Sequence, residues 1–330
     1  MQARIERRLL ATAMLVLAAS TTASAAEYET PRTPWGHPDL QGTYSNGSQT
    51  PFERPEALGT KAFLTEEETA EMEKRRAEVV TSAAESAANR TVAGGRVGGY
   101  NQHWMDPQRN VVGTRRTSLV VDPADGRVPI RPEALAQRDY HLREIGNDYI
   151  HLGPWDRCIT RGVPGGFFQS GYNNNYIILQ TPDTVAIYFE MIHNVRLIPL
   201  NDRPPLDPDL QLWNGDSRGH WEGDTLVVET KNLSDKGWIA SSGFQGRMRG
   251  IAQTRNTHVL ERFTRLDDNT IDYQVTVTDP AIYTAPWTAQ IPLYTQEGLE
   301  IYEYACHEGN WAVHNTLSGA RAQDRAAESP

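Results

Sequence analysis

The second half of the chain is a series of short β-strand patterns separated by turns, and this feature limits the possible folds most. Residues 270–278 alternate between apolar side chains, from Ile271 to Val277, and polar ones, which is typical of an antiparallel strand with one buried face. The other segments that are rich in β-branched and aromatic residues are 176–180, 184–192, 195–199, 219–222, 225–231, 257–265, 287–294 and 300–305. No helical pattern falls between them, so we expect a mainly β fold, an antiparallel barrel or sandwich over about 175–310.

The first half is less regular, and we expect an irregular, partly helical extension there. Residues 64–88 predict one surface helix, because Thr65 and Glu68 form a capping box and the segment has high helix propensity. Residues 116–130 place two strand-like segments around a turn, which predicts a β-hairpin. The expected organisation is a signal peptide at 1–25, the N-terminal extension at 26–170 and the antiparallel barrel at 171–330.

The N-terminus has the three parts of a secretory signal. Arg4, Arg7 and Arg8 precede an apolar run at 9–19, and Ala23-Ser24-Ala25 forms a cleavage site for signal peptidase. The apolar run is about half as long as a helix that crosses the hydrocarbon core, and no later run is long enough either. We therefore expect cleavage after about Ala25, a periplasmic or secreted location and no transmembrane anchor.

Composition narrows the class of partner. The formal net charge of -10 disfavours nucleic acid, whose phosphates need a basic surface. The sequence has no haem signature, dinucleotide fingerprint or phosphate-binding loop. We expect a small-molecule substrate or ligand and no cofactor; the oligomeric state stays open.

The chain has two cysteines, Cys158 and Cys306. In an oxidising compartment they are expected to form a disulfide. The bridge would close a loop of about 150 residues and stabilise the fold by about 3–5 kcal/mol. The alternative is a nucleophilic Cys306 beside His307, but adjacent residues on a strand point to opposite faces.

Four blocks carry a resemblance: TPWGHPDLQGTYSN at 33–46, RTSLVVDPADGRVP at 116–129, DSRGHWEGDTLVVET at 216–230 and EYACHEGN at 303–310. Together they resemble a family of largely uncharacterised exported bacterial proteins, which offers no catalytic residues to transfer. Gly219-His220-Trp221 is also similar to the Gly-x-Trp that opens a strand at the base of lipocalin-type barrels. This second resemblance implies a lipocalin-like barrel with a small-molecule cavity, a fold that hosts both carriers and enzymes.

Two patterns favour a hydrolase. Residues 215–219 match G-x-S-x-G with Ser217 as the nucleophile, although the motif requires a following helix and the next residues predict a turn and a strand. The histidines are scattered and no metal-binding motif is present, so no metal ligand is assigned; a three-histidine site that activates water could arise only through the fold.

Acid–base chemistry is the leading hypothesis. Glu190 and His193 flank a predicted strand end, where a carboxylate in an apolar setting suits a general acid or base. His307 and Glu308 follow Cys306 and form a second candidate pair. The alternatives are that Glu190 lies on the outer face or pairs with Arg196, and that His307 and Glu308 only cap a strand.

Further polar residues are candidates for substrate binding. They are Tyr172, Asn174, Asp216, Arg218, His220, His258, Glu261 and Tyr304. We expect an exported, cofactor-independent enzyme that performs elimination, hydration or isomerisation on a small organic substrate in the barrel cavity. The alternatives are a non-catalytic periplasmic binding protein and a hydrolase that uses Ser217 or a metal-bound water.

Overall fold

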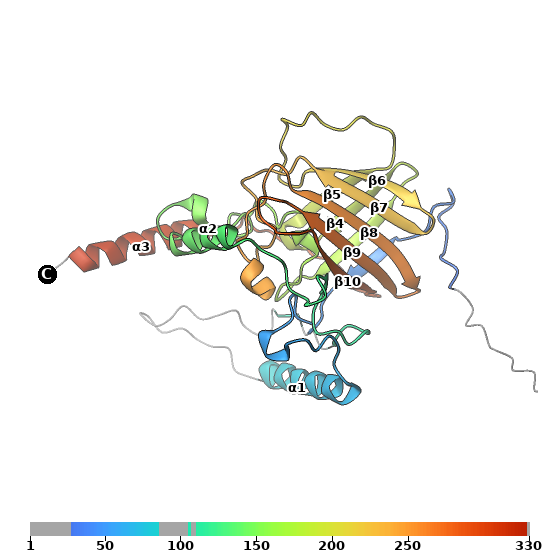
Figure 1. Ribbon diagram of the computed structural model, residues 1–330, viewed down its shortest axis with the longest axis horizontal. Coiled ribbons are helices and arrows are strands. Elements are labelled where there is room, and N and C mark those ends of the chain that lie inside the picture. Colours follow the sequence, from blue (N-terminus) through green and yellow to red (C-terminus); the bar gives the residue numbers. More distant parts are fainter. Residues whose placement is uncertain (1–27, 86–104, 107–109, 329–330) are drawn as a thin grey trace, which may run out of the picture.

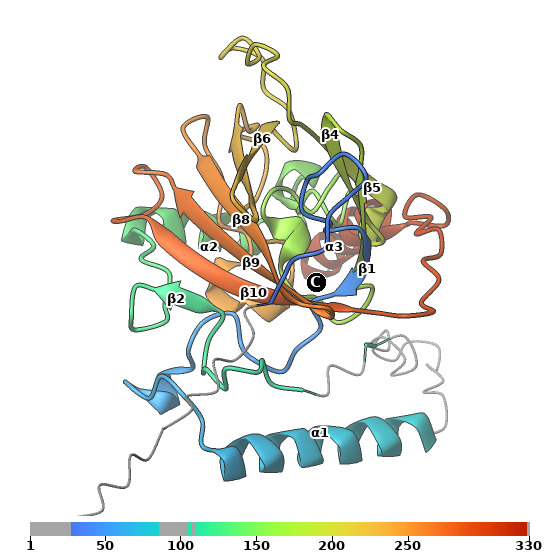
Figure 2. The same ribbon diagram turned by 90° about the vertical axis from the view of Figure 1, so that its right-hand side faces the viewer.

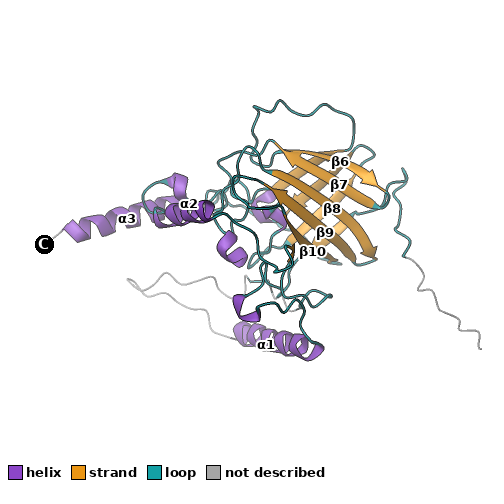
Figure 3. Ribbon diagram, in the orientation of Figure 1, coloured by secondary structure: helices purple, strands orange, loops and turns teal. Residues whose placement is uncertain are grey.

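The computed structural model describes residues 28–85, 105–106 and 110–328. The expected signal peptide lies outside these residues. The mainly β prediction is confirmed: ten strands form one antiparallel sheet that curves into a nearly closed barrel (Figures 1 and 2). Most loops and the helices α2 and α3 lie at one end of this barrel (Figure 3). That end positions the candidate site.

Most strands follow the predicted segments, but the β-hairpin predicted at 116–130 is wrong. The strands are β1 Gly42–Ser45, β2 Val120–Asp122, β3 Asn175–Gln180, β4 Thr184–Phe189, β5 Asn194–Pro199, β6 Asp216–Glu222, β7 Thr225–Lys231, β8 His258–Asp267, β9 Thr270–Thr278 and β10 Trp287–Thr295. Their order in the sheet is β5-β4-β3-β1-β10-β9-β8-β7-β6, and β2 pairs with β10. Within 116–130 only Val120–Asp122 is a strand, and it pairs with β10, while Arg116 and Ile130 form isolated bridges with Phe63 and Tyr283. Along β9, the apolar residues from Ile271 to Val277 are fully buried, as their alternation predicts.

The N-terminal extension contributes to the barrel. β1 lies between β3 and β10, where Tyr44 pairs with Tyr176 on one side and with Thr295 on the other. The predicted strand at 300–305 is wrong, because this segment is irregular. Both edges of β10 are already taken, by β9 and by β1 with β2, so the chain after β10 finds no strand partner there.

The three α-helices lie outside the barrel wall. α1 spans Glu66–Glu85, and its predicted capping box is present: the backbone N–H of Thr65 donates to Glu68, and that of Glu68 donates to the Thr65 hydroxyl. α2 spans Pro132–Arg143, and α3 spans Ala312–Glu328. Among the described residues, no helix is both long and apolar enough to cross a bilayer.

Aromatic side chains fill the barrel interior. Phe167, which a short 3₁₀ helix carries into the barrel, packs on Tyr273 with ring centroids 4.4 Å apart, and Tyr176 and Phe263 complete the cluster. All four rings are buried. The hollow next to them, bordered by Arg196, has a volume of about 10 Å³, which is the space of about one water molecule. Within the described residues, this hollow is therefore too small for the ligand cavity that the lipocalin resemblance implies.

A buried ion pair spans the gap in the barrel wall. β5 and β6 are the two ends of the strand order, and Arg196 on β5 reaches across with its Nε 3.0 Å from Ser217 Oγ on β6. Its guanidinium also donates to Thr230 on β7, at 2.7 Å, and to both carboxylate oxygens of Glu261 on β8. Tyr273 donates to the same carboxylate at 2.9 Å. Glu261 thus faces the interior, as its apolar neighbours on the strand suggest, but it serves to close the barrel.

Candidate functional site

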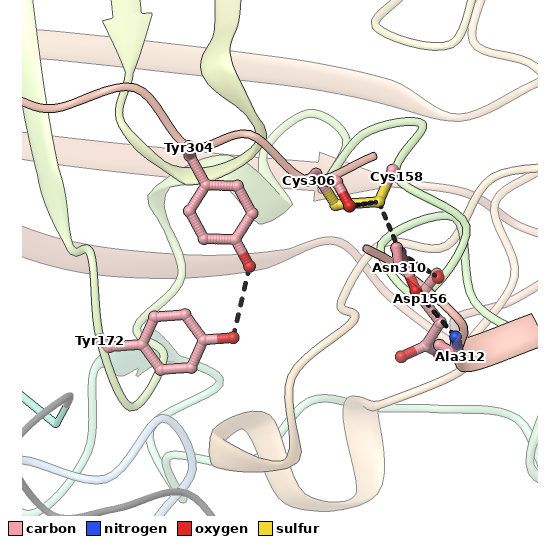
Figure 4. The surroundings of a disulfide bond; sticks show 7 residues. All are labelled: Asp156, Cys158, Tyr172, Tyr304, Cys306, Asn310 and Ala312. Atoms are coloured by element: carbon pink, nitrogen blue, oxygen red, sulfur yellow. Dashed lines mark hydrogen bonds between the residues drawn. A yellow bond between two sulfur atoms is a disulfide. The ribbon is translucent and has the colours of Figure 1, made fainter. Parts of the chain in front are cut away.

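The predicted disulfide is confirmed and shapes the end of the barrel. Cys158 and Cys306 are bonded, with Cα atoms 5.6 Å apart, and so tie the irregular segment after β10 to the loops before β3 (Figure 4). Asn310 donates from Nδ2 to the Cys158 sulfur at 2.8 Å, and its Oδ1 accepts from the backbone N–H of Ala312 at the start of α3. The disulfide and Asn310 together hold residues 303–308 across the barrel end.

Three adjoining hollows lie at this end of the barrel, and we call them together the rim cleft. Residues 303–308 border two of them, and the third shares residues with one of these two. The inner hollow, of about 770 Å³, is bordered by Trp155, Asp156, Tyr172, Glu190, Tyr304 and Glu308 among others. An apolar hollow of about 570 Å³ shares Trp155, Asp156 and Tyr172 with it and adds Met105, Phe244 and Arg249. The outer hollow, of about 400 Å³, lies against the same 303–308 segment and is bordered by His193, His307 and Glu308.

Unusual backbone conformations gather at this cleft. In the described part of the chain six non-glycine residues have positive φ, and four of them border the cleft: Cys158 at 55°, Asn173 at 51°, Ile192 at 62° and His193 at 54°. The left-handed region is especially costly for a β-branched residue such as Ile192. Residues in such strained conformations cost about 1–3 kcal/mol each and concentrate at functional sites, which favours the rim cleft over other surfaces.

Glu190 is the best-placed carboxylate of those that the sequence predicted. Its residue is only 5 % exposed, at the end of β4, and it borders the inner hollow. Asn175 on β3 donates to its Oε2 at 2.7 Å, and no described residue donates a hydrogen bond to Oε1. It pairs with Asn175 rather than with Arg196, so the alternative partner expected from the sequence is wrong. A fixed carboxylate with one oxygen open to a hollow is a suitable general base.

Asp156 is a second inner carboxylate, which the sequence reasoning missed. It borders both the inner and the apolar hollow. Burial raises the pKa of Asp156, against the opposing effects of Arg249, the backbone N–H of Gly153 and Arg157. A carboxyl group that keeps its proton to higher pH is a suitable general acid. No motif surrounds Asp156, and only the fold reveals its burial.

Two tyrosine hydroxyls face each other in the inner hollow. The hydroxyl oxygens of Tyr172 and Tyr304 are 3.4 Å apart, and their rings are nearly parallel, with an interplanar angle of 11° (Figure 4). Tyr172 comes from the loop before β3 and Tyr304 from the segment that the disulfide holds. The structure thus brings these two predicted binding residues together with Glu190 and Glu308.

His193 and His307 lie in the outer hollow with Glu308 and do not border the inner one. Both imidazoles are exposed. His193 Nδ1 is 2.8 Å from the Tyr188 hydroxyl. The backbone N–H of His193 donates to the Glu190 carbonyl at 3.1 Å, but among the described residues no hydrogen bond joins the His193 imidazole to the side chain of Glu190 or of His307. The sequence predicted two acid–base pairs, Glu190 with His193 and His307 with Glu308. Both pairs border the rim cleft, but within the described chain no hydrogen bond joins one pair to the other.

The other predicted site residues lie elsewhere or have structural partners. Asp216 and Arg218 bind each other, and Arg218 also donates to the carbonyls of Arg203 and Pro204, so this pair holds the loop between β5 and β6. His220 is exposed beside Glu222, and His258 lies 3.8 Å from Glu229. Asn174 is buried and donates to Asp106 and to the Ser170 carbonyl. These contacts position loops and strands.

Ser217 lies on a continuous strand, β6, which runs from Asp216 to Glu222. Its hydroxyl is inside the barrel, where it accepts from Arg196 and contacts Thr230 at 3.0 Å. A nucleophile elbow places the serine on a sharp turn between a strand and a helix. Here Ser217 lies within strand β6, and the next element is another strand, β7. The G-x-S-x-G match is therefore a feature of the barrel wall.

The histidines do not gather into a larger cluster. His141 and His151 approach each other, with their Nδ1 atoms 2.8 Å apart. Within the residues that the structure covers, no three His, Cys, Asp or Glu side chains are grouped so that they could hold a metal ion.

Fold and cleft together define an antiparallel barrel protein with a filled interior and a polar, aromatic-lined cleft at one rim. No family model matches the chain, and no curated protein and no solved structure is significantly similar to it. The functional argument therefore depends on the geometry of the rim cleft.

Proposed function

We propose that this protein is an exported enzyme that moves protons on a small organic substrate in the rim cleft. The reaction class is elimination, hydration or isomerisation. The observation that carries the proposal is the meeting of two inner carboxyl groups, Asp156 and Glu190, with the facing hydroxyls of Tyr172 and Tyr304 in one hollow. Acid–base enzymes need this division of roles, with one group that accepts a proton and another that donates one.

The environments of the two carboxyl groups suggest their roles. Glu190 is held by Asn175 through one oxygen, so its other oxygen can take a proton from a substrate carbon. Partial burial raises the pKa of Asp156 above its ordinary value, so it keeps its proton to higher pH than a free carboxyl group and can donate it to a leaving group or to a carbon. His193 and His307 border the neighbouring hollow, from which they can pass protons to solvent.

Proton removal can be measured before the natural substrate is known. The protein is incubated in D₂O with a panel of small neutral carbonyl compounds, and mass spectrometry follows the replacement of C–H by C–D. We expect wild-type protein to exchange one class of compound and Glu190→Gln to exchange it about 100-fold more slowly or worse, because a general base contributes about 10²–10⁴ to the rate.

The matched control for this assay is Glu229→Gln. It makes the same chemical change on β7, where Glu229 is paired with Lys231 on the surface. We expect this variant to exchange at the wild-type rate. A Glu190→Gln protein that keeps the wild-type rate would rule out Glu190 as the base, and a panel without any exchange would favour the binding-protein alternative.

A further inference from the structure

Arg161 is a buried cation that has no carboxylate partner among the described residues. Its residue is only 4 % exposed, and within the described part of the chain its one hydrogen bond runs from the guanidinium to the Phe168 carbonyl at 2.8 Å. Of the residues that the structure describes, none forms a hydrogen bond with its buried Nε, and no Asp or Glu forms an ion pair with it within 4 Å. Buried charges in proteins are normally paired, because an isolated one is costly. Arg196, by contrast, is buried and forms an ion pair with Glu261.

The surroundings of Arg161 point toward the rim cleft. Its guanidinium carbon lies 5.2 Å from the centre of the Trp155 ring. The phenol groups of Tyr172 and Tyr304 are close enough to interact with its charge, as is the buried Tyr176. Trp155, Tyr172 and Tyr304 all border the inner hollow. Arg161 itself borders the small hollow inside the barrel and not the inner hollow, so its positive charge acts on the two facing hydroxyls from outside the inner hollow.

We propose that Tyr172 and Tyr304, with Arg161 near them, form a site for an oxygen atom that becomes negatively charged during the reaction. Each hydroxyl can donate a hydrogen bond to the same substrate oxygen, and a nearby buried cation strengthens both bonds. This inference deepens the proposed function and rests on it: it assigns the substrate class, a neutral carbonyl compound with an acidic neighbouring C–H bond.

The electron movement is balanced within the substrate. Glu190 takes the proton from the carbon next to the carbonyl group, and the C–H electron pair becomes a C=C bond. One C=O pair moves to the oxygen, which becomes an enolate oxygen that accepts a hydrogen bond from each of the two hydroxyls. When the proton returns to the same carbon the result is exchange. In a β,γ-unsaturated substrate the enolate is conjugated with the second C=C bond, and return of the proton to the γ carbon shifts that bond and gives isomerisation.

The rest of the cleft restricts the remainder of the substrate. Glu190, Glu303 and Glu308 border the same hollow, so a substrate that carries a negative charge away from the oxygen that the two hydroxyls bind is repelled. The adjoining hollow offers Met105, Phe244 and Trp155, which favour an apolar or aromatic body. A neutral ketone, aldehyde or ester with such a body fits both conditions.

The probe for this site is 4-nitrophenol, a planar compound that ionises near neutral pH and whose anion absorbs visible light. We expect wild-type protein to bind the anion in preference to the neutral phenol, so that the pKa of the probe falls when it binds. Tyr172→Phe and Tyr304→Phe should each weaken binding of the anion about tenfold or more, as expected for hydrogen bonds to a charged group. Arg161→Met should remove the preference for the anion.

The matched control is Tyr140→Phe. Tyr140 is 48 % exposed on α2 and borders none of the three hollows of the rim cleft, so this variant should bind the probe as wild type does. The tyrosine variants keep the test decisive if Arg161→Met does not fold. The inference is overturned if the probe does not bind, if bound and free probe ionise alike, or if all three tyrosine variants behave alike.

The two proposals fail in different ways. Glu190→Gln should lose deuterium exchange and still bind the 4-nitrophenol anion, because it removes the base and leaves the oxygen site. If Tyr304→Phe loses the preference for the anion while wild-type protein shows no exchange, the oxygen site stands and the proton-transfer proposal falls. If exchange proceeds normally in Tyr304→Phe, the oxygen site falls and the base remains supported.

Discussion

Loss of either charge of the Arg196–Glu261 pair is expected to lower the free energy of unfolding by about 3–5 kcal/mol, because the remaining charge is left buried without its partner. Both side chains are at most 3 % exposed. Arg196 also donates to Ser217 and Thr230, and it is the side chain that spans the gap between β5 and β6. We therefore expect Arg196→Met and Glu261→Gln to unfold at a much lower denaturant concentration than wild type.

Two comparisons make this prediction specific. The double variant Arg196→Met with Glu261→Gln should be less destabilised than the sum of the two single variants, because it leaves no unpaired charge. Arg262→Met breaks an exposed pair with Glu222 and should cost less than about 1 kcal/mol. Denaturant unfolding curves measure all four proteins. A Glu261→Gln protein within about 1 kcal/mol of wild type would show that the pair does not hold the barrel closed.

The second large effect is expected from the disulfide. Cys158 and Cys306 are 148 residues apart, and a cross-link that closes a loop of this length stabilises a protein by about 5 kcal/mol through the unfolded chain. The Cys158→Ser, Cys306→Ser double variant should lose most of this stability. It should also lose deuterium exchange, because residues 303–308, which the disulfide holds in place, form part of the wall of the inner and outer hollows.

Reduction of the disulfide in wild-type protein provides the control for this prediction. Wild-type protein with a thiol reductant should unfold at nearly the same denaturant concentration as the double variant, and the double variant should not respond to the reductant. If reduced and oxidised wild-type protein have the same free energy of unfolding, the bridge does not stabilise the fold as we argue.

The strands and the disulfide could be predicted from the sequence, because both depend on local or compositional signals. The alternation along 270–278 gives the buried face of β9 directly, and two cysteines in an expected oxidising compartment have only each other as partners. The position of β1 could not be predicted. Four residues near the N-terminus pair between β3 and β10, and no local pattern specifies a contact at that distance along the chain.

The candidate site was predictable only in part. Glu190, Glu308, Tyr172 and Tyr304 were expected to be functional from their residue types and neighbours, and the fold brings them to one hollow. Asp156 and Arg161 lie in a loop without periodicity or motif. What distinguishes them is burial, and for Arg161 the absence of a carboxylate partner in the described chain. Both properties arise from tertiary packing and cannot be inferred from the residues beside them.

The central claim is that the chemistry takes place in the rim cleft and not inside the barrel. The most direct test is a crystal structure of the Glu190→Gln protein with the carbonyl compound that wild-type protein exchanges fastest. We expect the acidic carbon within about 3.5 Å of the side chain at position 190, and the carbonyl oxygen between the Tyr172 and Tyr304 hydroxyls. A compound bound beside Arg196 and Glu261 in the barrel, or on the outer face of the strands, would contradict the account.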